Sequence, residues 1–147
     1  MRTCERAVAA FFRTHRFTAK VEVCEHTRIE VGHRVDDGVL SLCHRLDKVA
    51  AGTVLTVTDF RLGPEATASE VVVRRFCRLI RMLLRTVPHV TYVRGMILPG
   101  VSDAHRRDTR QRLAAVLERE GAFWREEDGD RWLVFCRSGG EPALGLR

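Results

Sequence analysis

The apolar residues of this chain change their spacing twice, and that change limits the folds open to it. Between residues 17 and 61 they alternate with polar residues, as at Val21 and Val23, which is the pattern of half-buried strands. Over residues 68–86 they recur at helical spacing, and over residues 90–98 they form a short run typical of a buried strand. The order strand, helix, strand predicts a crossover between neighbouring parallel strands, which is expected to be right-handed.

Turn and cap residues place the ends of the elements. Asp36-Asp37-Gly38 predicts a hairpin turn, because Asp and Gly adopt a positive φ at low cost. Asp128-Gly129 predicts a second hairpin, and the T-x-x-E pattern of residues 67–70 predicts a capping box ahead of the long helix. The predicted elements are a helix at 3–15, strands around residues 21–23 and at 27–35, 39–46 and 53–61, a helix at 68–86, a strand at 90–98, a helix at 103–120, and strands at 123–126 and 131–136.

Size and composition favour a single folded domain. Of the 147 residues, 45% are hydrophobic and 30% are charged, which does not match disordered or low-complexity chains. We expect one α/β domain over residues 1–137, with a mixed, mostly antiparallel sheet and flanking helices, followed by a loose tail at 138–147. No apolar run approaches the ~18 residues of a membrane span, and the start of the chain lacks a signal-peptide core, so we expect a cytoplasmic location without membrane contact.

The cysteines and histidines show no spacing typical of a metal site or a catalytic site. The five cysteines are odd in number and never form a C-x-x-C pair, so they indicate neither a disulfide framework nor a zinc ribbon. We expect Cys24, Cys43, Cys77 and Cys136 to be small buried hydrophobes. The six histidines are scattered along the chain, and no triad can be argued from their spacing. The sequence therefore predicts no metal and no catalytic residue.

The order of the predicted elements carries a resemblance. A helix, about three antiparallel strands, a helix, a strand, a helix and a strand pair follow one another, and the segment EREGAFW at 118–124 precedes the last pair. This arrangement resembles the GNAT family of N-acetyltransferases over roughly residues 17–136. The resemblance implies a GNAT-like crossover over residues 53–98, with adjacent parallel strands that splay at their carboxyl ends.

The same resemblance implies a site for acetyl-CoA in the loop after the fourth strand. In that family an R/Q-x-x-G-x-G/A signature holds the pyrophosphate with backbone N–H groups at a helix N-terminus. The matching stretch here has Pro64 at the first glycine position of the pattern and Glu65 next to it. Pro64 removes a donor and Glu65 adds negative charge, so we expect no useful binding of acetyl-CoA. If the chain is an acyltransferase, the residues that hold acyl-CoA are Arg61, Leu62, Gly63, Ala66 and Thr67.

A second resemblance is to the low-calcium-response R regulators of type III secretion. The segments that carry it are RFCRL at 75–79, VRGM at 93–96 and RLAAVL at 112–117. This resemblance implies a regulatory or accessory role in secretion, with protein partners such as a component of the secretion apparatus or a chaperone. It identifies no catalytic residue.

Arginines gather on one face of the predicted helix 68–86. The chain has a net charge of +6, and its only lysines are Lys20 and Lys48. Such a bias can reflect a GC-rich genome, but it also suits bidentate binding of carboxylates and phosphates. The four arginines spaced at i, i+4, i+7 and i+11 are Arg74, Arg78, Arg81 and Arg85. They are our candidate partner-binding residues for an acidic protein surface, although a solvated face paired with local acids is the alternative.

Other partners are less well matched. Arg106, Arg107 and Arg110 form a second basic cluster, which can equally be the wet side of an amphipathic helix. Nucleic acid is the weakest candidate, because the stripe lacks the interleaved aromatic residues that stack on bases. The sequence therefore favours a non-catalytic accessory or regulatory protein that acts through protein contacts, with an acyl-CoA-dependent acyltransferase and a nucleic-acid-binding regulator as alternatives.

Overall fold

A single seven-stranded sheet organises the chain. A computed structural model describes residues 2–23, 27–28, 30–62, 69–96 and 104–137, and the sheet order is β1-β2-β3-β4-β5-β7-β6. The elements are α1 (Arg2–Thr14), β1 (Thr18–Val23), β2 (Glu30–Asp36), β3 (Leu40–Val49), β4 (Gly52–Leu62), α2 (Ser69–Thr86), β5 (Val90–Gly95), α3 (Ala104–Arg119), β6 (Phe123–Glu127) and β7 (Asp130–Cys136). The prediction of one mixed, mostly antiparallel α/β sheet with flanking helices is confirmed.

The predicted crossover is present. β4 and β5 are adjacent and parallel, and every other neighbouring pair in the sheet is antiparallel. The pairing of β4 with β5 ends at Val57 opposite Gly95, whereas β4 continues to Leu62. The carboxyl end of β4 therefore has no partner from β5 among the described residues, and the chain after Met96, where the resemblance implies a splay, lies outside them.

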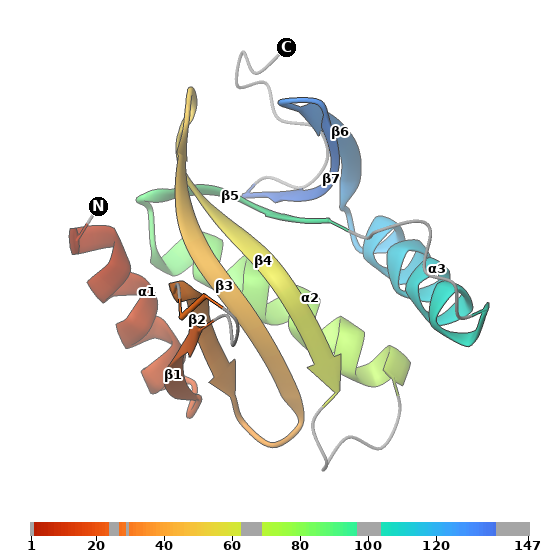
Figure 1. The fold of residues 1–147 in the computed structure, drawn as a ribbon, viewed down its shortest axis with the longest axis horizontal. Helices are drawn as coiled ribbons and strands as arrows, with labels where there is room; N and C mark the ends of the chain where they lie inside the picture. Colours follow the sequence, from red (N-terminus) through yellow and green to blue (C-terminus); the bar gives the residue numbers. More distant parts are fainter. Residues whose placement is uncertain (1, 24–26, 29, 63–68, 97–103, 138–147) are drawn as a thin grey trace.

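The main core lies between the helices and one face of the sheet. α1 contributes Val8 and Phe12, α3 contributes Val116 and Leu117, and all four are buried in the same cluster as the apolar face of α2. In Figure 1, α2 runs behind the sheet, with α1 toward the β1–β2 end and α3 toward the β6–β7 end. The predicted apolar face of α2 is confirmed: Val72, Val73, Phe76, Leu79, Ile80, Leu83 and Leu84 are all buried.

A smaller cluster occupies the other face of the sheet. Neighbouring strand residues point to opposite faces, so Leu55 joins the main core while Val54 turns away from it. Val54 packs there with Tyr92, Trp132, Val134 and Cys136. The strands β4, β5 and β7 are therefore buried on both faces, as expected for the apolar run of β5.

The turn predictions are confirmed. Asp37 holds the β2–β3 turn, because its Oδ1 accepts hydrogen bonds from the backbone N–H groups of Val39 and Leu40, both at 3.0 Å. Asp128 and Gly129 have φ values of 52° and 83°, the geometry of a two-residue hairpin turn. At the end of α3 the Ala122 N–H donates to the Leu117 carbonyl at 3.0 Å, which closes the helix with the expected terminal motif.

Some details differ from the sequence predictions. Four strands precede α2, which matches the four predicted ranges, whereas the order that carries the resemblance had about three. The prediction of a half-buried strand at Val21 and Val23 is wrong, since their exposed fractions are 50% and 41%. β1 is an edge strand paired only with β2, and the main core does not extend to it. Residues 97–98 and the tail at 138–147 lie outside the described residues.

Three of the four cysteines predicted to be buried are confirmed, and the fourth is not among the described residues. Cys43, Cys77 and Cys136 are buried, while Cys24 lies outside the described residues. Burial raises the pKa of the Cys77 thiol to about 12 and that of Cys136 to about 11. Both thiols stay protonated near neutral pH and are poor nucleophiles there. Among the described helices, none combines the length and the apolar content that a membrane-spanning helix requires.

Candidate functional site

The arginine stripe lies on α2, opposite the apolar face that packs on the sheet. Arg74, Arg78 and Arg85 are exposed, and we call these three the α2 arginine surface. They recur at i, i+4 and i+11, so they project from one side of the helix. Two exposed apolar residues accompany them, Val71 at 58% and Met82 at 38%. The outer face of α2 therefore offers both positive charge and apolar area.

Arg81, the fourth predicted residue, has a different environment. Its Nη2 donates to the backbone carbonyl of Glu120 and lies 3.1 Å from the Glu120 carboxylate. Its guanidinium carbon is 6.0 Å from the centre of the Phe135 ring. Arg81 thus ties α2 to the end of α3, where a cation is favoured by the carbonyl groups of the helix terminus.

Acidic residues of the described chain pair with only some of the four arginines in the stripe. Within the described part of the chain, Arg78 and Arg85 form no hydrogen bond or ion pair. Arg74 lies beside Arg119 and Glu120 at a shallow hollow of about 150 Å³. The alternative of a fully paired, solvated face therefore holds for Arg81 but not for Arg78 or Arg85.

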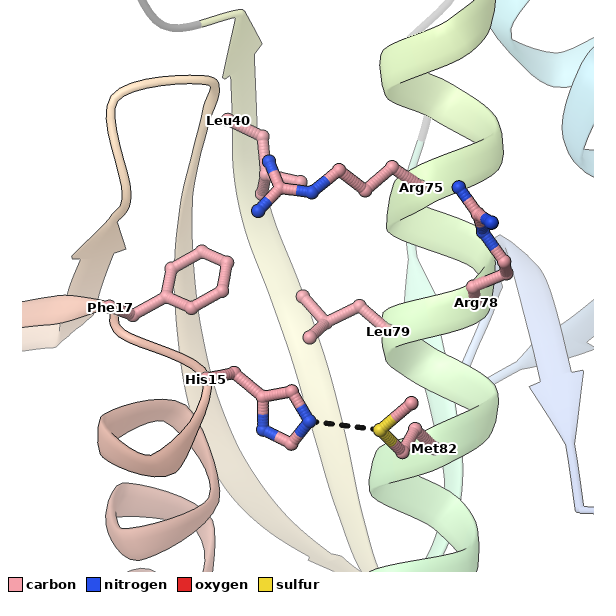
Figure 2. Close-up of a pocket in the computed structure, with 7 residues that line it drawn as sticks. All are labelled: His15, Phe17, Leu40, Arg75, Arg78, Leu79 and Met82. Carbon is pink, nitrogen blue, oxygen red and sulfur yellow. Dashed lines mark hydrogen bonds between the residues drawn. The ribbon is translucent and has the colours of Figure 1, made fainter.

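A pocket of about 300 Å³ lies between α1 and α2, next to the α2 arginine surface. Figure 2 shows the Arg75 guanidinium reaching from α2 toward Leu40, above the side chains of Phe17 and Leu79. The Arg75 Nη2 donates to Asp37 in the β2–β3 turn. The residues that line the pocket are His15, Phe17, Leu40, Arg75, Arg78, Leu79 and Met82.

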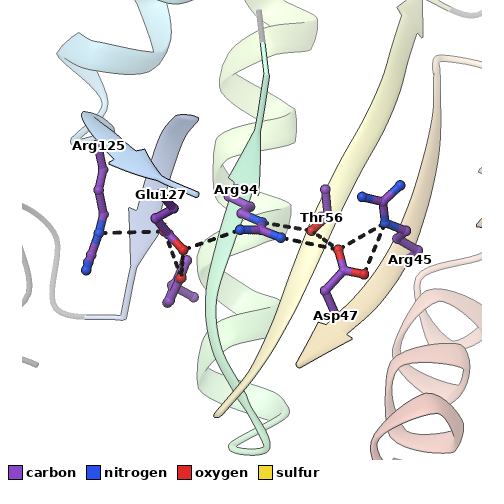
Figure 3. Close-up of polar contacts among 7 residues, drawn as sticks. Arg45, Asp47, Thr56, Arg94, Arg125 and Glu127 are labelled. Carbon is purple, nitrogen blue, oxygen red and sulfur yellow. Dashed lines mark hydrogen bonds and ion pairs between the residues drawn. The ribbon is translucent and has the colours of Figure 1, made fainter. Parts of the chain in front are cut away.

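The other face of the sheet carries a buried polar network that sequence reasoning missed (Figure 3). Arg94 on β5 is at its centre and is only 7% exposed. Its guanidinium donates to the Thr56 hydroxyl at 3.0 Å, and it lies 3.3 Å from Glu127 and 3.4 Å from Asp47. It also stacks on the Trp132 ring, at 4.1 Å from the ring centre. The network joins β3, β4, β5 and β6 through charged groups.

The acids of this network are fully engaged. Asp47 accepts hydrogen bonds from Thr56 and Arg45; burial alone raises its pKa, but these bonds outweigh burial and leave the pKa below its usual value. The Tyr92 hydroxyl donates to Glu127 at 2.8 Å, and burial together with that carboxylate raises the pKa of Tyr92. Tyr92 therefore stays neutral and Asp47 stays charged at neutral pH. The arrangement holds strands together and offers no poised acid and base.

One signal in the sequence could have located this network. Arg94 interrupts the apolar run of residues 90–98, and it shares a face with Tyr92 because side chains alternate along a strand. A buried arginine needs acidic partners, so its presence predicts carboxylates on neighbouring strands. Their identity depends on strand register, which the sequence does not reveal.

The structure describes only two of the five residues predicted to hold acyl-CoA. Arg61 is exposed on β4 and pairs with Asp59 at 2.7 Å, and Leu62 ends the strand. Gly63, Ala66 and Thr67 lie outside the described residues, as do Pro64 and Glu65. Arg106, Arg107 and Arg110 belong to α3. The predicted cofactor site therefore stays a prediction.

Comparisons with known proteins give structural likeness alone. A scan against protein-family models finds no match, and a search of curated proteins finds no similar sequence. The AtaT–AtaR complex bound to DNA has a TM-score of 0.44 and 9% identity over 89% of this chain and 74% of that chain. The toxin AtaT bound to acetyl-CoA and the C-terminus of its antitoxin has a TM-score of 0.41 and 12% identity over the same shares. The KacTA–DNA complex has a TM-score of 0.42 and 12% identity over 90% of this chain and 80% of that chain.

Proposed function

We propose that this chain is a non-catalytic binding domain that docks an acidic protein segment on the exposed face of α2. The observation that carries the proposal is the α2 arginine surface, three exposed arginines on one side of a helix with exposed Val71 and Met82 beside them. Aligned arginines and adjoining apolar groups match an acidic amphipathic segment, which would supply carboxylates and buried apolar contacts together.

Charge repulsion supports this use of the surface. Like charges at i and i+4 destabilise a helix by roughly 0.2–0.5 kcal/mol per pair, and Arg74 and Arg78 have that spacing. A carboxylate that binds between the two arginines offsets their repulsion, and this contributes to the binding free energy. The helix already holds both charges in place before the partner binds. Such contacts mainly raise the association rate, and they weaken as salt screens them.

The polar groups on the other face support a non-catalytic role. The carboxylates of Asp47 and Glu127 are bound by arginines, and the Tyr92 hydroxyl is bound by Glu127. General acid and base catalysis requires side chains whose pKa lies near the working pH and that can reach a substrate. In the described part of the chain this network provides neither.

The partner belongs, in this proposal, to a type III secretion system, as a component of the apparatus or a chaperone. This assignment depends on the resemblance of segments 75–79, 93–96 and 112–117 to the low-calcium-response R regulators. All three segments contribute to the folded core, through Phe76, Val93 and Leu117. The first also contains Arg78 of the α2 arginine surface, which is where the proposal places the partner.

Affinity capture with charge-reversed protein tests the proposal. The test variant carries Arg74→Glu, Arg78→Glu and Arg85→Glu, and it leaves Arg81 unchanged because that residue ties α2 to α3. Wild type should retain an acidic protein from the cell lysate at low salt, and the variant should lose it at least tenfold.

A matched control is available on α1. Arg2, Arg6 and Arg13 are exposed and have the same i, i+4 and i+11 spacing, so reversing them changes the net charge equally. Circular dichroism must show both variants folded. Equal retention by the two variants, or equal loss, would show that the α2 arginine surface has no specific role.

A second candidate function is acyl transfer from acyl-CoA, and the end of β4 that extends past β5 favours it. Beyond Val57, β4 has no strand partner on its β5 side among the described residues, so its backbone groups there can bind an extended ligand. Calorimetry with acetyl-CoA separates the candidates. Our proposal expects no heat of binding at micromolar concentrations, whereas binding that is lost on substitution within residues 61–67 would establish the acyltransferase.

A further inference from the structure

We infer that the pocket between α1 and α2 binds a small amphipathic carboxylate, with its anionic head at Arg75 and its apolar body between Phe17 and Leu79. This inference does not rest on the proposed docking of a protein. Arg74 and Arg85 lie outside the pocket, and the residues shared with the proposed docking face are Arg78 and Met82.

Arg75 provides the site for the head group. Its Nη2 is committed to Asp37, but its Nη1 is buried and has no hydrogen-bond partner in the described part of the structure. The Arg75 side chain as a whole is 38% exposed, and a carboxylate oxygen is the best-matched partner for a guanidinium donor without an acceptor. The ion pair with Asp37 also holds the guanidinium in place, and Figure 2 shows the Arg75 side chain extending across the top of the pocket.

Apolar side chains provide the site for the body. Phe17, Leu40 and Leu79 are each less than 9% exposed and form the walls, while Met82 reaches the rim. The volume of about 300 Å³ equals that of roughly ten water molecules at ~30 Å³ each, which is space for a ligand of about ten non-hydrogen atoms. Octanoate has that size and joins a flexible alkyl chain to one carboxylate, so it is a suitable probe.

The charges around the pocket select anions. Arg75 and Arg78 are the charged residues that line it, and His15 closes its lower end with Nε2 placed 2.8 Å from the Met82 sulfur. Among the residues that the structure describes, no acidic side chain lines the pocket, and Asp37 at its edge is engaged with Arg75. A cationic or neutral ligand of the same shape would leave the Nη1 donor unmatched.

Methyl NMR titration with octanoate tests the inference, and 1-octanol serves as the neutral probe of similar length. Octanoate should shift the methyl signals of Leu79 and Met82 and bind at least tenfold more tightly than octanol. Equal affinity for the two probes would overturn the role of Arg75, and no saturable shift with octanoate would overturn the site itself.

Two pocket variants and one control keep the result interpretable. Arg75→Met removes the head-group donor, and Met82→Trp fills the pocket without disturbing the Arg75–Asp37 pair. Each should weaken octanoate binding at least tenfold, whereas Arg85→Met, which removes the same charge outside the pocket, should leave it unchanged. Unchanged binding in Met82→Trp, or equal loss in Arg85→Met, would contradict the inference even if Arg75→Met unfolds.

Discussion

The imidazole of His44 has an unusual environment for a titratable group. It stacks between the rings of Phe12 at 5.0 Å and His33 at 5.9 Å, and its Nδ1 is buried without a hydrogen-bond partner in the described structure. Burial, with a further contribution from His33, lowers the pKa of His44 from 6.5 to about 4. The folded chain therefore favours the neutral form of His44, and this makes the free energy of unfolding depend on pH.

Acid should destabilise the fold through His44. The unfolded chain takes up this proton near pH 6.5 and the folded chain only near pH 4, so the free energy of unfolding falls as pH drops through that window. The expected loss is roughly 3 kcal/mol, from ~1.36 kcal/mol per pKa unit. In urea titrations from pH 7 to 4, His44→Phe should abolish most of this loss while exposed His89→Gln should not. An equal pH slope in wild type and His44→Phe would contradict this assignment.

The polar network should respond unequally to removal of its members. Glu127→Leu leaves Tyr92 and Arg94 buried with fewer partners, and breaking such a pair costs about 3–5 kcal/mol. Arg94→Met leaves each carboxylate with another partner, Arg45 for Asp47 and Tyr92 for Glu127, so we expect a cost lower by about 1 kcal/mol or more. Urea unfolding of both variants and of the double variant measures this. The double variant should lose less than the sum, and strict additivity would show that the two residues are not coupled.

At the residue scale, the sequence predicts burial better than it predicts partners. The buried face of α2 follows from helical periodicity alone, as Val72, Ile80 and Leu84 illustrate. The contact of Arg81 with Glu120 does not, because it joins residues of two helices whose packing is set by the whole sheet. The sequence predicts a stripe of four arginines on α2, and three of them are exposed and form the α2 arginine surface.

At the element scale, the end of α1 shows a local conflict between residue type and backbone. The Phe17 N–H donates to the Phe12 carbonyl at 2.9 Å, a terminal motif that usually has glycine at the preceding residue. Arg16 occupies that position with φ of 66°, which is unfavourable for a residue with a Cβ. The motif forms because Phe12 and Phe17 are both buried on either side of it.

Relief of this strain should stabilise the protein. Arg16→Gly should raise the free energy of unfolding by about 1 kcal/mol, because glycine adopts the left-handed conformation without a steric penalty. Exposed Arg6 lies inside α1, and Arg6→Gly should lower it by about 1 kcal/mol. Thermal unfolding compares the two. A lower melting temperature for Arg16→Gly would indicate that the arginine side chain contributes more than the strain costs.

The order of the elements was predictable, whereas the limits of burial at the sheet edge were not. The change of period located β4, α2 and β5, and turn residues such as Asp37 and Gly129 located the hairpins. Alternation at Val21 and Val23 indicated a buried strand face, yet β1 lies at the edge. The alternation of apolar and polar residues indicates a strand. Whether a helix covers the apolar face of that strand depends on residues that are distant in the sequence.

At the scale of the whole molecule, the two faces of the sheet have different roles. One face packs on three helices through a large apolar core, and the other is held by charges and a smaller cluster around Trp132. The crossover between the parallel strands β4 and β5 thus packs α2 against one face of the sheet and leaves its outer side exposed. This arrangement leads us to place function on the outer side of α2.

Site-specific photocrosslinking in cell lysate tests that placement most directly. A benzoylphenylalanine is placed at exposed Val71 on α2, and another at exposed Asp130 on β7 serves as control. The account predicts a discrete adduct with an acidic protein from position 71 only, lost at high salt and lost when Arg74, Arg78 and Arg85 are reversed to Glu. Adducts of equal yield from both positions, or an adduct from position 71 that persists after the charge reversal, would contradict it.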